Sequence, residues 1–556
     1  MDPRPGRWTS LALPAVMALV PFEPRRPTLP LGPFHVTVLE GAALIALVAM
    51  FTFEGASHAD GTRRRRPGLP ALLLAAFAGV ELLSAITSDD PAGSMKFALR
   101  MACMAAFAAG VARSDPGARG RALAGLALGG LVAAALATAE GVGWRALDPL
   151  LAAFREMPFN VAGVRRATAG SEYPNLGSTG IAYGLLAAVA WAGARRWGPL
   201  RTIPLALPYA LGLLYTYSRG AVVALAVALT VAAAVLAAAD GAQASAKGRA
   251  ILAPAVALGV LAVVGGAFAF GGEVFQLRLA SEGVGDWYGA RYEPEAAALS
   301  LAPGGATTTA VRVTNTGRKA WTREGQFHLS YHWYDVERRL AMDGGRTALP
   351  RTLDSGQSVV LMPEVRAPRT SGEYLLLWDM VQEHTSWFSG QGVRPAVVRV
   401  TVGDPPPAVR AVSAPPLPAG LAWRPGRGEL WTLAGRMWRA HPLLGVGPDR
   451  FRHLYGPWAG QTWWDDRVYA NNLFLEVAAT AGTIAAALLA ATLIVGLGRA
   501  WGARTDEEAL AEAAAAASLL AFVAVHGVVD YVLAFTGHYL VLGFAVGTAS
   551  ARGRRE

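Results

Sequence analysis

Long apolar runs recur along most of this chain. A membrane-spanning helix needs about 20 mostly apolar residues, because its backbone must satisfy all of its hydrogen bonds internally. About twelve runs approach this requirement. They lie near residues 8–22, 34–53, 69–88, 95–112, 120–140, 177–194, 202–217, 219–239, 251–271, 473–496, 508–526 and 532–551. The pattern predicts a mainly α-helical, polytopic membrane helix bundle of about twelve spans.

Residues 297–402 have a different pattern, in which apolar and polar residues alternate. Such runs, separated by Gly, Asn, Asp and Pro turns, lie at 308–313, 327–334, 358–362, 373–378 and 396–402. Alternation with a period of two is typical of half-buried strands, and several short strands in about 105 residues are typical of a two-sheet sandwich. We therefore expect an extracytoplasmic β-sandwich inserted between the ninth and tenth spans.

These patterns divide the chain into five parts. They are an N-terminal membrane bundle of about nine spans (1–271), a loop entry (272–296), the sandwich (297–402), an extracytoplasmic linker with an amphipathic helix and a motif loop (403–472), and C-terminal membrane helices (473–556). Prolines at 405–407, 415, 416 and 418 predict a stiff linker. Apolar residues on one face predict a helix from Arg427 to about His441.

Composition and charge change how the chain should be classified. Only 16% of the residues are charged and 53% are hydrophobic, against about 25% charged in soluble proteins. The net charge of +10 would by itself suggest a protein that binds nucleic acid. However, the arginines gather in every second short loop, such as 63–66 and 195–201, as expected of cytoplasmic loops. We expect a multi-pass protein of the bacterial inner (cytoplasmic) membrane, with its large loop in the periplasm or outside and no nucleic-acid partner. The single cysteine, Cys103, excludes an intrachain disulfide and a multi-cysteine metal site.

Polar motifs lie at the expected outer ends of the membrane segments. They are residues 216–220 (TYSRG), 427–431 (RGELW) leading into 441–451 (HPLLGVGPDRF), 471–476 (NNLFLE) and 525–531 (VHGVVDY), together with Arg166, Pro174 and Asn175. In order and spacing, this set resembles the O-antigen ligase/polymerase superfamily, the integral membrane glycosyltransferases of bacterial envelopes. Residues 311–317 (VRVTNTG), followed by Trp321, resemble the immunoglobulin-like domain of a selective-autophagy receptor.

The resemblance implies a reaction and its partners. A glycan carried on a polyprenyl-diphosphate lipid is transferred to an acceptor hydroxyl on the extracytoplasmic side. The acceptor is a lipid A-core sugar in ligases, another lipid-linked glycan in polymerases, or a protein side chain in related enzymes. The resemblance implies no metal and no cofactor, and membrane lipids surround the bundle.

Arginines are the expected ligands of the donor diphosphate. A guanidinium group makes paired hydrogen bonds to phosphate oxygens. The resemblance and this chemistry point to Arg166, Arg219 and Arg427. Each has a plainer alternative, as a membrane-interface anchor or a surface residue.

The acceptor hydroxyl needs a base, and the sequence leaves its identity open. Ligases of the family have a histidine where this chain has Asn471, and an amide is not a base near neutral pH. The catalytic candidates besides Arg219 and Arg427 are His441, Asn471 and Glu476. The possible supporting residues are Asn175, Asn472, His526 and Asp530, of which His526 and Asp530 would share a face if helical. His441 has the alternative of capping its helix.

A second class of function remains open at this stage. Because of Asn471, the chain could be a non-catalytic membrane transporter or a glycan-binding envelope scaffold. A transporter would more often carry an internal repeat, and the sequence shows no clear one.

Overall fold

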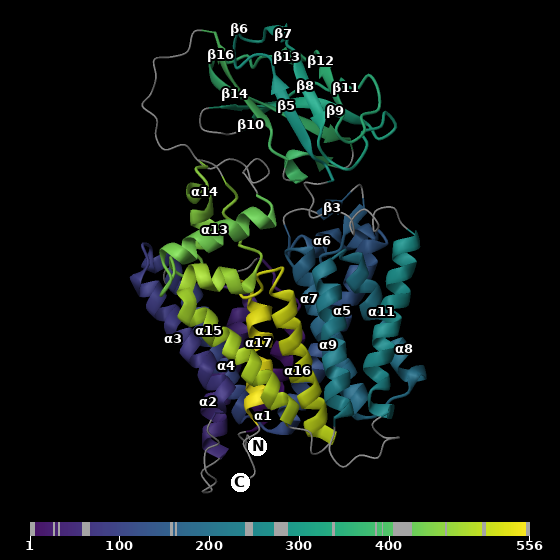
Figure 1. The fold of residues 1–556 in the computed structure, drawn as a ribbon, viewed down its shortest axis with the longest axis vertical. Helices are drawn as coiled ribbons and strands as arrows, with labels where there is room; N and C mark the ends of the chain where they lie inside the picture. Colours follow the sequence, from purple (N-terminus) through teal and green to yellow (C-terminus); the bar gives the residue numbers. More distant parts are fainter. Residues whose placement is uncertain are drawn as a thin grey trace.

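The computed structural model joins a helical bundle to a β-domain at one end (Figure 1). The first helix of the chain begins, and the last helix ends, at the opposite end of the bundle. The structure describes residues 6–25, 28–31, 34–57, 67–155, 159–161, 164–238, 248–271, 287–335, 340–383, 386–391, 393–403, 425–461, 464–502 and 507–551. The proline-rich linker expected at 405–418 lies outside these ranges.

Helices occupy each place where an apolar run predicts a span. They are α1 (Gly6–Leu19), α2 (Val38–Ser57), α3 (Leu69–Thr87), α4 (Pro91–Arg113), α5 (Pro116–Gly141), α7 (Pro174–Ala194), α8 (Pro199–Tyr215), α9 (Arg219–Ala237), α11 (Leu252–Gly271), α15 (Leu473–Gly502), α16 (Glu507–His526) and α17 (Thr536–Ser550). Among the described residues, 8 helices are long and apolar enough to cross a membrane. The helical membrane character expected from the sequence is confirmed at this level.

Local sequence explains where several of these helices begin. Asp90 and Asp115 cap α4 and α5, since their carboxylates accept hydrogen bonds from the N–H groups of Gly93 (3.0 Å) and Ala118 (2.8 Å). Each is followed at once by proline, whose fixed φ and missing N–H suit the first helical position.

Small residues let central helices pack closely. A Cβ atom at Gly130 of α5 would lie 2.6 Å from the Cα atom of Gly184 of α7. Close backbone approach of this kind is typical of helix contacts in membranes, where lipid competes equally well for large apolar side chains. α7 is consequently buried along most of its length at the centre of the bundle.

The β-domain contains two main sheets. The larger has the order β10-β9-β14-β16-β6 with β11 and β15 at its margins, the second has the order β12-β8-β5, and β13 pairs with β7. Their bounds are β5 (Ala290–Pro294), β6 (Ala298–Leu301), β7 (Ala306–Thr308), β8 (Val311–Asn315), β9 (Phe327–Asp335), β10 (Leu340–Asp343), β11 (Thr347–Ala348), β12 (Ser358–Leu361), β13 (Glu364–Arg366), β14 (Gly372–Gln382), β15 (Ser386–Trp387) and β16 (Ala396–Val402). All five expected strands are present. The domain begins before residue 297, because β5 pairs with β8.

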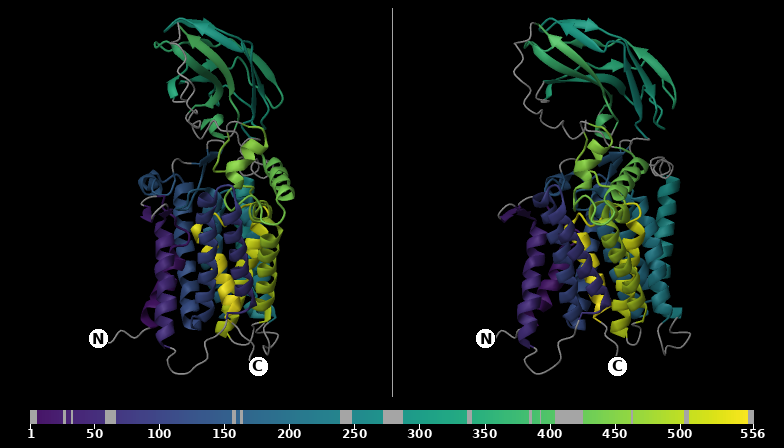
Figure 2. Two further views of the ribbon diagram at one scale, coloured as in Figure 1. Left: turned by 90° about the vertical axis from the view of Figure 1, so that its left-hand side faces the viewer. Right: turned by 60° about the vertical axis from the view of Figure 1, so that its left-hand side comes forward.

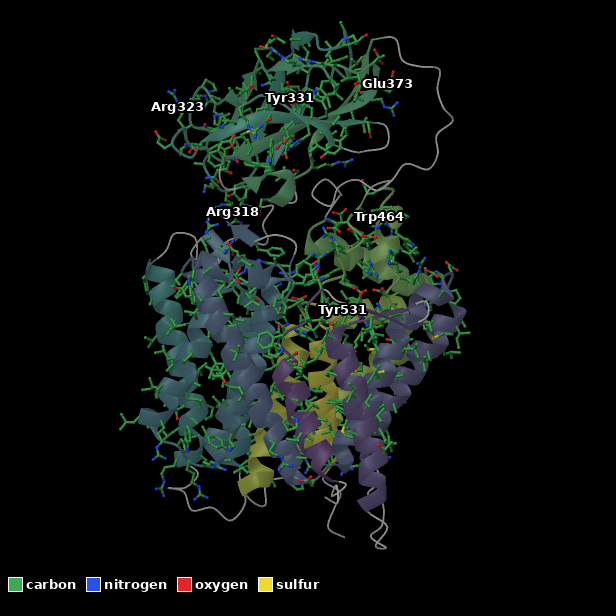
Figure 3. The ribbon with its side chains drawn as sticks, turned by 180° about the vertical axis from the view of Figure 1, so that it is seen from behind. Arg318, Arg323, Tyr331, Glu373, Trp464 and Tyr531 are labelled. Atoms are coloured by element: carbon green, nitrogen blue, oxygen red, sulfur yellow. The ribbon has the colours of Figure 1, made fainter. Side chains whose placement is uncertain are left out.

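Aromatic side chains fill the β-domain core. Trp321, Trp333 and Trp378 are fully buried, so these three rings belong to the core and are not exposed platforms for a sugar. Trp378 packs edge-on to Tyr331 with ring centroids 5.4 Å apart. Figure 3 shows Tyr331 within the domain and Arg318 at its edge nearest the bundle.

Two carboxylates flank a histidine inside this domain. His332 Nδ1 lies 2.6 Å from Asp343 Oδ1, and its Nε2 lies 3.8 Å from Asp379 Oδ2. Burial alone would lower the pKa of His332, but hydrogen bonds to Asp379 and Asp343 outweigh it and raise the pKa above its usual value. The charged imidazole therefore stabilises the contact between β9, β10 and β14.

This arrangement predicts a loss of local stability at alkaline pH. The stabilisation from His332 is complete below its unfolded-state pKa of about 6.5 and is lost as pH rises through the raised folded-state pKa. Protection factors of β9 and β14 amides in the full chain should fall as the pH rises above about 6.5 and through the raised pKa of His332. His332→Gln should remove most of this dependence, whereas His328→Gln on the same strand should keep it. Equal pH dependence in the two variants would contradict the assignment.

Two short helices lie between the bundle and the β-domain (Figures 1 and 2). They are α13 (Arg427–Ala440) and α14 (Phe451–Trp458). α13 packs on α15 and buries Leu430, Leu433, Ala434 and Met437, which confirms the expected amphipathic helix. The small elements on the loops are β1 (Leu29–Leu31), β2 (Phe34–Val36), α6 (Asp148–Leu151), β3 (Phe159–Val161) and β4 (Val164–Arg166).

Candidate functional site

The α15 helix is broken at Gly482, where the motif loop 441–449 meets the bundle. Gly482 has φ 82° and ψ −177°, a conformation that belongs almost only to glycine. The loop supplies partners to the interrupted helix: Pro442 O accepts from Thr483 N (2.8 Å), and Gly447 N donates to Thr480 O (2.9 Å). Ser84 Oγ of α3 donates to both Leu444 O (2.6 Å) and Thr480 O (3.0 Å). The HPLLGVG motif thus supplies hydrogen-bond partners to the backbone at the break in α15. Irregular backbone inside a membrane needs such partners, because lipid offers none.

A hydrogen-bonded chain connects several of the other motifs. Arg166 is 7% exposed, and its guanidinium donates to Thr216 O (3.0 Å) and Asn175 Oδ1 (3.1 Å). Asn175 Nδ2 in turn donates to Asp530 Oδ2 (3.1 Å). β4, the start of α7, the α8–α9 turn and the α16–α17 loop are therefore held together by polar contacts, which we call the Arg166–Asp530 network.

The start of α9 lies against the end of α16. A Cβ atom at Gly220 would lie 3.6 Å from Nε2 of His526, so the backbone of the residue after Arg219 runs close to the imidazole. Arg219 itself is half-buried. The positive charge of Arg427 also acts on His526, which brings the beginning of α13 toward the same place. The beginnings of α9 and α13 therefore both lie in the neighbourhood of His526.

The pairing expected between His526 and Asp530 needs correction. α16 ends at His526, so Asp530 belongs to a loop and does not share a helix face with it. Asp530 accepts instead from Asn175 and from Tyr531 N (2.8 Å). The Nδ1 atom of His526 has no hydrogen-bond partner within the described ranges.

The NNLFLE motif organises the beginning of α15. Asn472 Oδ1 accepts from Leu475 N (2.9 Å) as a helix cap, and its Nδ2 donates to Val528 O (2.9 Å). Glu476 is fully buried, and its Oε2 accepts from Ala470 N (2.6 Å). Its Oε1 has no partner in the part of the chain that the structure describes. Asn472 thus joins this motif to the α16–α17 loop, next to the Arg166–Asp530 network.

His441 and Asn471 each have a backbone role: His441 ends α13, and Asn471 has a positive φ just before α15. His441 is exposed at the end of α13, and its carbonyl accepts from Gly445 N (3.0 Å). Among the residues that the structure describes, no hydrogen bond connects its ring to the Arg166–Asp530 network. Asn471 has φ 51°, in the left-handed region that asparagine tolerates better than most residues.

The conformation of Asn471 predicts how substitutions there affect stability. Asn471→Gly should leave the thermal unfolding temperature close to that of the wild type, because glycine adopts positive φ without strain. Asn471→Val should lower the stability by about 1–2 kcal/mol, because Cβ branching disfavours that backbone. Unfolding of the detergent-solubilised chain, followed by tryptophan fluorescence, measures the difference. If both variants unfolded at the wild-type temperature, the backbone would not need positive φ.

Arg452 is a polar residue of this region that was not predicted from the sequence. Arg452 forms an ion pair with Asp449 (2.7 Å) and lies over the ring of Tyr469 (6.0 Å), and burial raises the pKa of that phenol well above its usual value. Tyr469 packs on Tyr531, which Figure 3 shows beneath Trp464 at the end of the bundle near the β-domain.

Two buried carboxyl groups were also missed. Glu140 of α5 accepts from Arg155 and from Thr168 N (2.8 Å), and this pair is shielded from solvent. Glu81 of α3 is fully buried with no partner for either carboxyl oxygen among the described residues. The sequence could have indicated both residues, because each is a glutamate within an apolar run, and an ionisable group inside a membrane segment normally has a function.

Comparisons with known proteins add no family assignment. Comparison with protein families and with curated proteins gives no match. One solved structure, the Pseudomonas fluorescens alkylpurine DNA glycosylase AlkC bound to DNA containing an abasic site analog, is similar at 12% identity and a TM-score of 0.13, covering 60% of this chain and 99% of that one. A TM-score this low carries no argument about fold or function.

Proposed function

We propose that this chain transfers a glycan from a polyprenyl-diphosphate lipid to an acceptor hydroxyl. The observation that carries the proposal is the meeting of separate motifs at one end of the bundle. Arg166, Asn175 and Asp530 are joined by hydrogen bonds, and Asn472 reaches the same α16–α17 loop. In this proposal all twelve helices cross a bacterial cytoplasmic membrane, and the β-domain lies on the extracytoplasmic side.

The diphosphate is the group that this end of the bundle should recognise. The N-terminus of a helix favours an anion, because its free N–H groups and the helix dipole both point toward it. Arg219 begins α9 and Arg427 begins α13, so each adds a guanidinium to such a terminus. We assign these two residues to the diphosphate. The contacts of Arg166 make it a positioning residue for Asn175 and the 216–220 turn.

During the transfer step, negative charge develops on the leaving diphosphate, the group to which we assign Arg219 and Arg427. The acceptor oxygen forms a bond to the anomeric carbon, and the bond from that carbon to the diphosphate oxygen breaks. The electron pair leaves with the lipid diphosphate, while the acceptor proton passes to a base. Fixed guanidinium groups stabilise the leaving diphosphate without reorganisation during the reaction.

Reconstitution tests the proposed function directly. The full chain in nanodiscs is incubated with a polyprenyl-diphosphate-linked oligosaccharide and, separately, with lipid A-core, a second lipid-linked glycan or an envelope protein. Mass spectrometry should detect a covalent glycan–acceptor product and free polyprenyl diphosphate with one of these acceptors. If the lipid-linked donor remained intact with every acceptor, the proposal would be contradicted.

A second candidate function is transport of a lipid-linked glycan. Broken helices and buried carboxyl groups within the membrane are typical of transporters. α15 is broken at Gly482 and carries the buried Glu476, and α3, which packs on α15, carries the buried Glu81. In proteoliposomes, a transporter would move a labelled lipid-linked glycan between leaflets without forming a covalent product. The transferase would form that product without net movement.

A further inference from the structure

The end of the bundle away from the β-domain presents arginines beside tryptophan rings. The end of α7, the start of α8 and the start of α11 lie there (Figure 1). Trp191 of α7 packs edge-on against Trp197, which precedes α8, with ring centroids 5.0 Å apart. A Cβ atom at Gly193 would lie 3.0 Å from Ala250 O, so the chain just before α11 lies against the end of α7. Three segments of the chain therefore meet at this place.

Arg195 lies over one of these rings. Its guanidinium carbon is 4.3 Å from the ring centroid of Trp191, a cation–π contact that orients the guanidinium without neutralising its charge. Arg249, the neighbour of Ala250, adds a second guanidinium from the segment before α11. Both arginines and Trp191 are exposed. We call Trp191, Arg195, Trp197 and Arg249 the Trp191–Arg249 surface.

The charge of this surface is not balanced by carboxylates. In the described part of the chain, neither Arg195 nor Arg249 forms an ion pair with an aspartate or a glutamate. Between the end of α7 and the start of α11 the sequence contains one acidic residue, Asp240, which lies outside the described ranges. Arg119 of α5, by contrast, forms a buried ion pair with Glu512 of α16 (3.0 Å). An anion from outside the chain would therefore complement the Trp191–Arg249 surface.

Exposed apolar side chains continue from this surface along α8. Leu200 is 92% exposed, Ile203 43% and Leu207 39%. Spacings of three and four residues place them on one face of the helix. The molecule thus changes from cationic and aromatic at the helix ends to apolar along α8, as membrane proteins do between the headgroups and the acyl chains of a leaflet. A soluble acidic protein would match the charge but not the adjoining apolar face.

We propose that the Trp191–Arg249 surface binds an anionic phospholipid of the leaflet opposite the β-domain. The lipid phosphate contacts the guanidinium groups, which make paired hydrogen bonds to phosphate oxygens. The indole rings lie at the level of the headgroup, and the acyl chains lie along the exposed face of α8. Basic surfaces between membrane helices on the cytoplasmic side recognise anionic headgroups in this way. The inference requires that the bundle lies in a membrane, and it does not depend on glycan transfer.

Native mass spectrometry of the full chain in detergent measures this binding. Dioleoyl phosphatidylglycerol and dioleoyl phosphatidylcholine have the same acyl chains but differ in net charge, and each is titrated separately. The wild type should bind the first phosphatidylglycerol about tenfold more tightly than the first phosphatidylcholine, because the arginines favour the lipid with uncompensated negative charge. Equal Kd values for the two lipids would overturn the inference.

Variants at two chain segments locate the site. Arg195→Gln should raise the Kd for phosphatidylglycerol about fivefold, the factor expected when one arginine near an anionic lipid is removed, and should leave the Kd for phosphatidylcholine unchanged. Arg249→Gln should give a similar loss, and it tests the site independently of any local unfolding at the end of α7. If both variants bound phosphatidylglycerol as tightly as the wild type, the inference would be wrong.

Arg113→Gln is the matched control. Arg113 is an exposed arginine at the end of α4 and lies over the ring of Phe51 (5.4 Å), but a carboxylate, Asp115, follows it closely in the sequence. This variant should keep the wild-type Kd for phosphatidylglycerol. A loss equal to that of Arg195→Gln would show that the lipid responds to the total charge of the bundle, and the Trp191–Arg249 surface would not be a site.

Inorganic phosphate distinguishes a phospholipid site from a site for free phosphate. In large excess, it should displace phosphatidylglycerol no more than chloride does at the same ionic strength, because it has no acyl chains to lie along α8. Specific displacement by phosphate would overturn the assignment to a lipid. The outcome is also separate from that of the proposed function, since the titration uses no glycan and Arg219 lies at the other end of the bundle.

Discussion

Replacing Arg219 by alanine should lower the rate of glycan transfer by about 10²–10³-fold, the usual effect of removing one group that stabilises charge in a transition state. Arg219 is half-buried at the beginning of α9, and the backbone of the next residue, Gly220, runs close to His526. Its loss removes positive charge from the place where we expect the lipid diphosphate. Initial rates of product formation in nanodiscs, measured by mass spectrometry, give the effect.

Two further variants separate charge from geometry in this experiment. Arg219→Lys should retain part of the rate, because lysine keeps the charge but not the paired hydrogen bonds. Arg201→Ala serves as the control, since Arg201 is an exposed arginine at the opposite end of the neighbouring helix α8. Wild-type rates in Arg219→Ala, or an equal loss in Arg201→Ala, would count against a diphosphate contact at Arg219.

Replacing Gly482 by alanine should destabilise the protein more than any other single change proposed here. Strained φ and ψ alone cost about 1–3 kcal/mol for a residue with a side chain. A Cβ atom at this position would also overlap Leu443 O and lie 2.6 Å from Leu444 N. The loop 441–449 would have to leave the break in α15, and its hydrogen bonds to Thr480 and Thr483 would be lost.

Gly498→Ala on the same helix provides the matched control for Gly482. A Cβ atom at Gly498 would meet nothing within 4 Å, and alanine favours a helix by about 1 kcal/mol over glycine. Thermal unfolding with size-exclusion chromatography should show a large loss for Gly482→Ala and no loss for Gly498→Ala. Equal stability of the two variants would show that the break in α15 is not required.

The sequence predicted the elements well, because their signals are local. Apolar runs of sufficient length marked the helices, and alternating residues marked five strands of the β-domain. The break in α15 was not predicted from residues 473–496, because a glycine inside an apolar run does not reveal its φ. The partners of the broken helix come from the HPLLGVG loop, which a motif alone does not place.

The candidate site was predictable only in part. The motifs marked Arg166, Asn175 and Asp530, which the structure joins. His526 and Asp530 were expected on one helix face, but α16 ends between them.

Hydropathy and charge along the chain by themselves determined that the protein is built from apolar helices, where the β-domain is inserted and at which helix ends the polar motifs lie. These properties depend on neighbouring residues. The tertiary structure alone decided which polar groups meet, since Asn175 and Asp530 are separated by 355 positions and Ser84 and Thr480 by 396. The physical reason is that hydrogen bonds and cavities depend on how distant helices pack, which local periodicity does not encode.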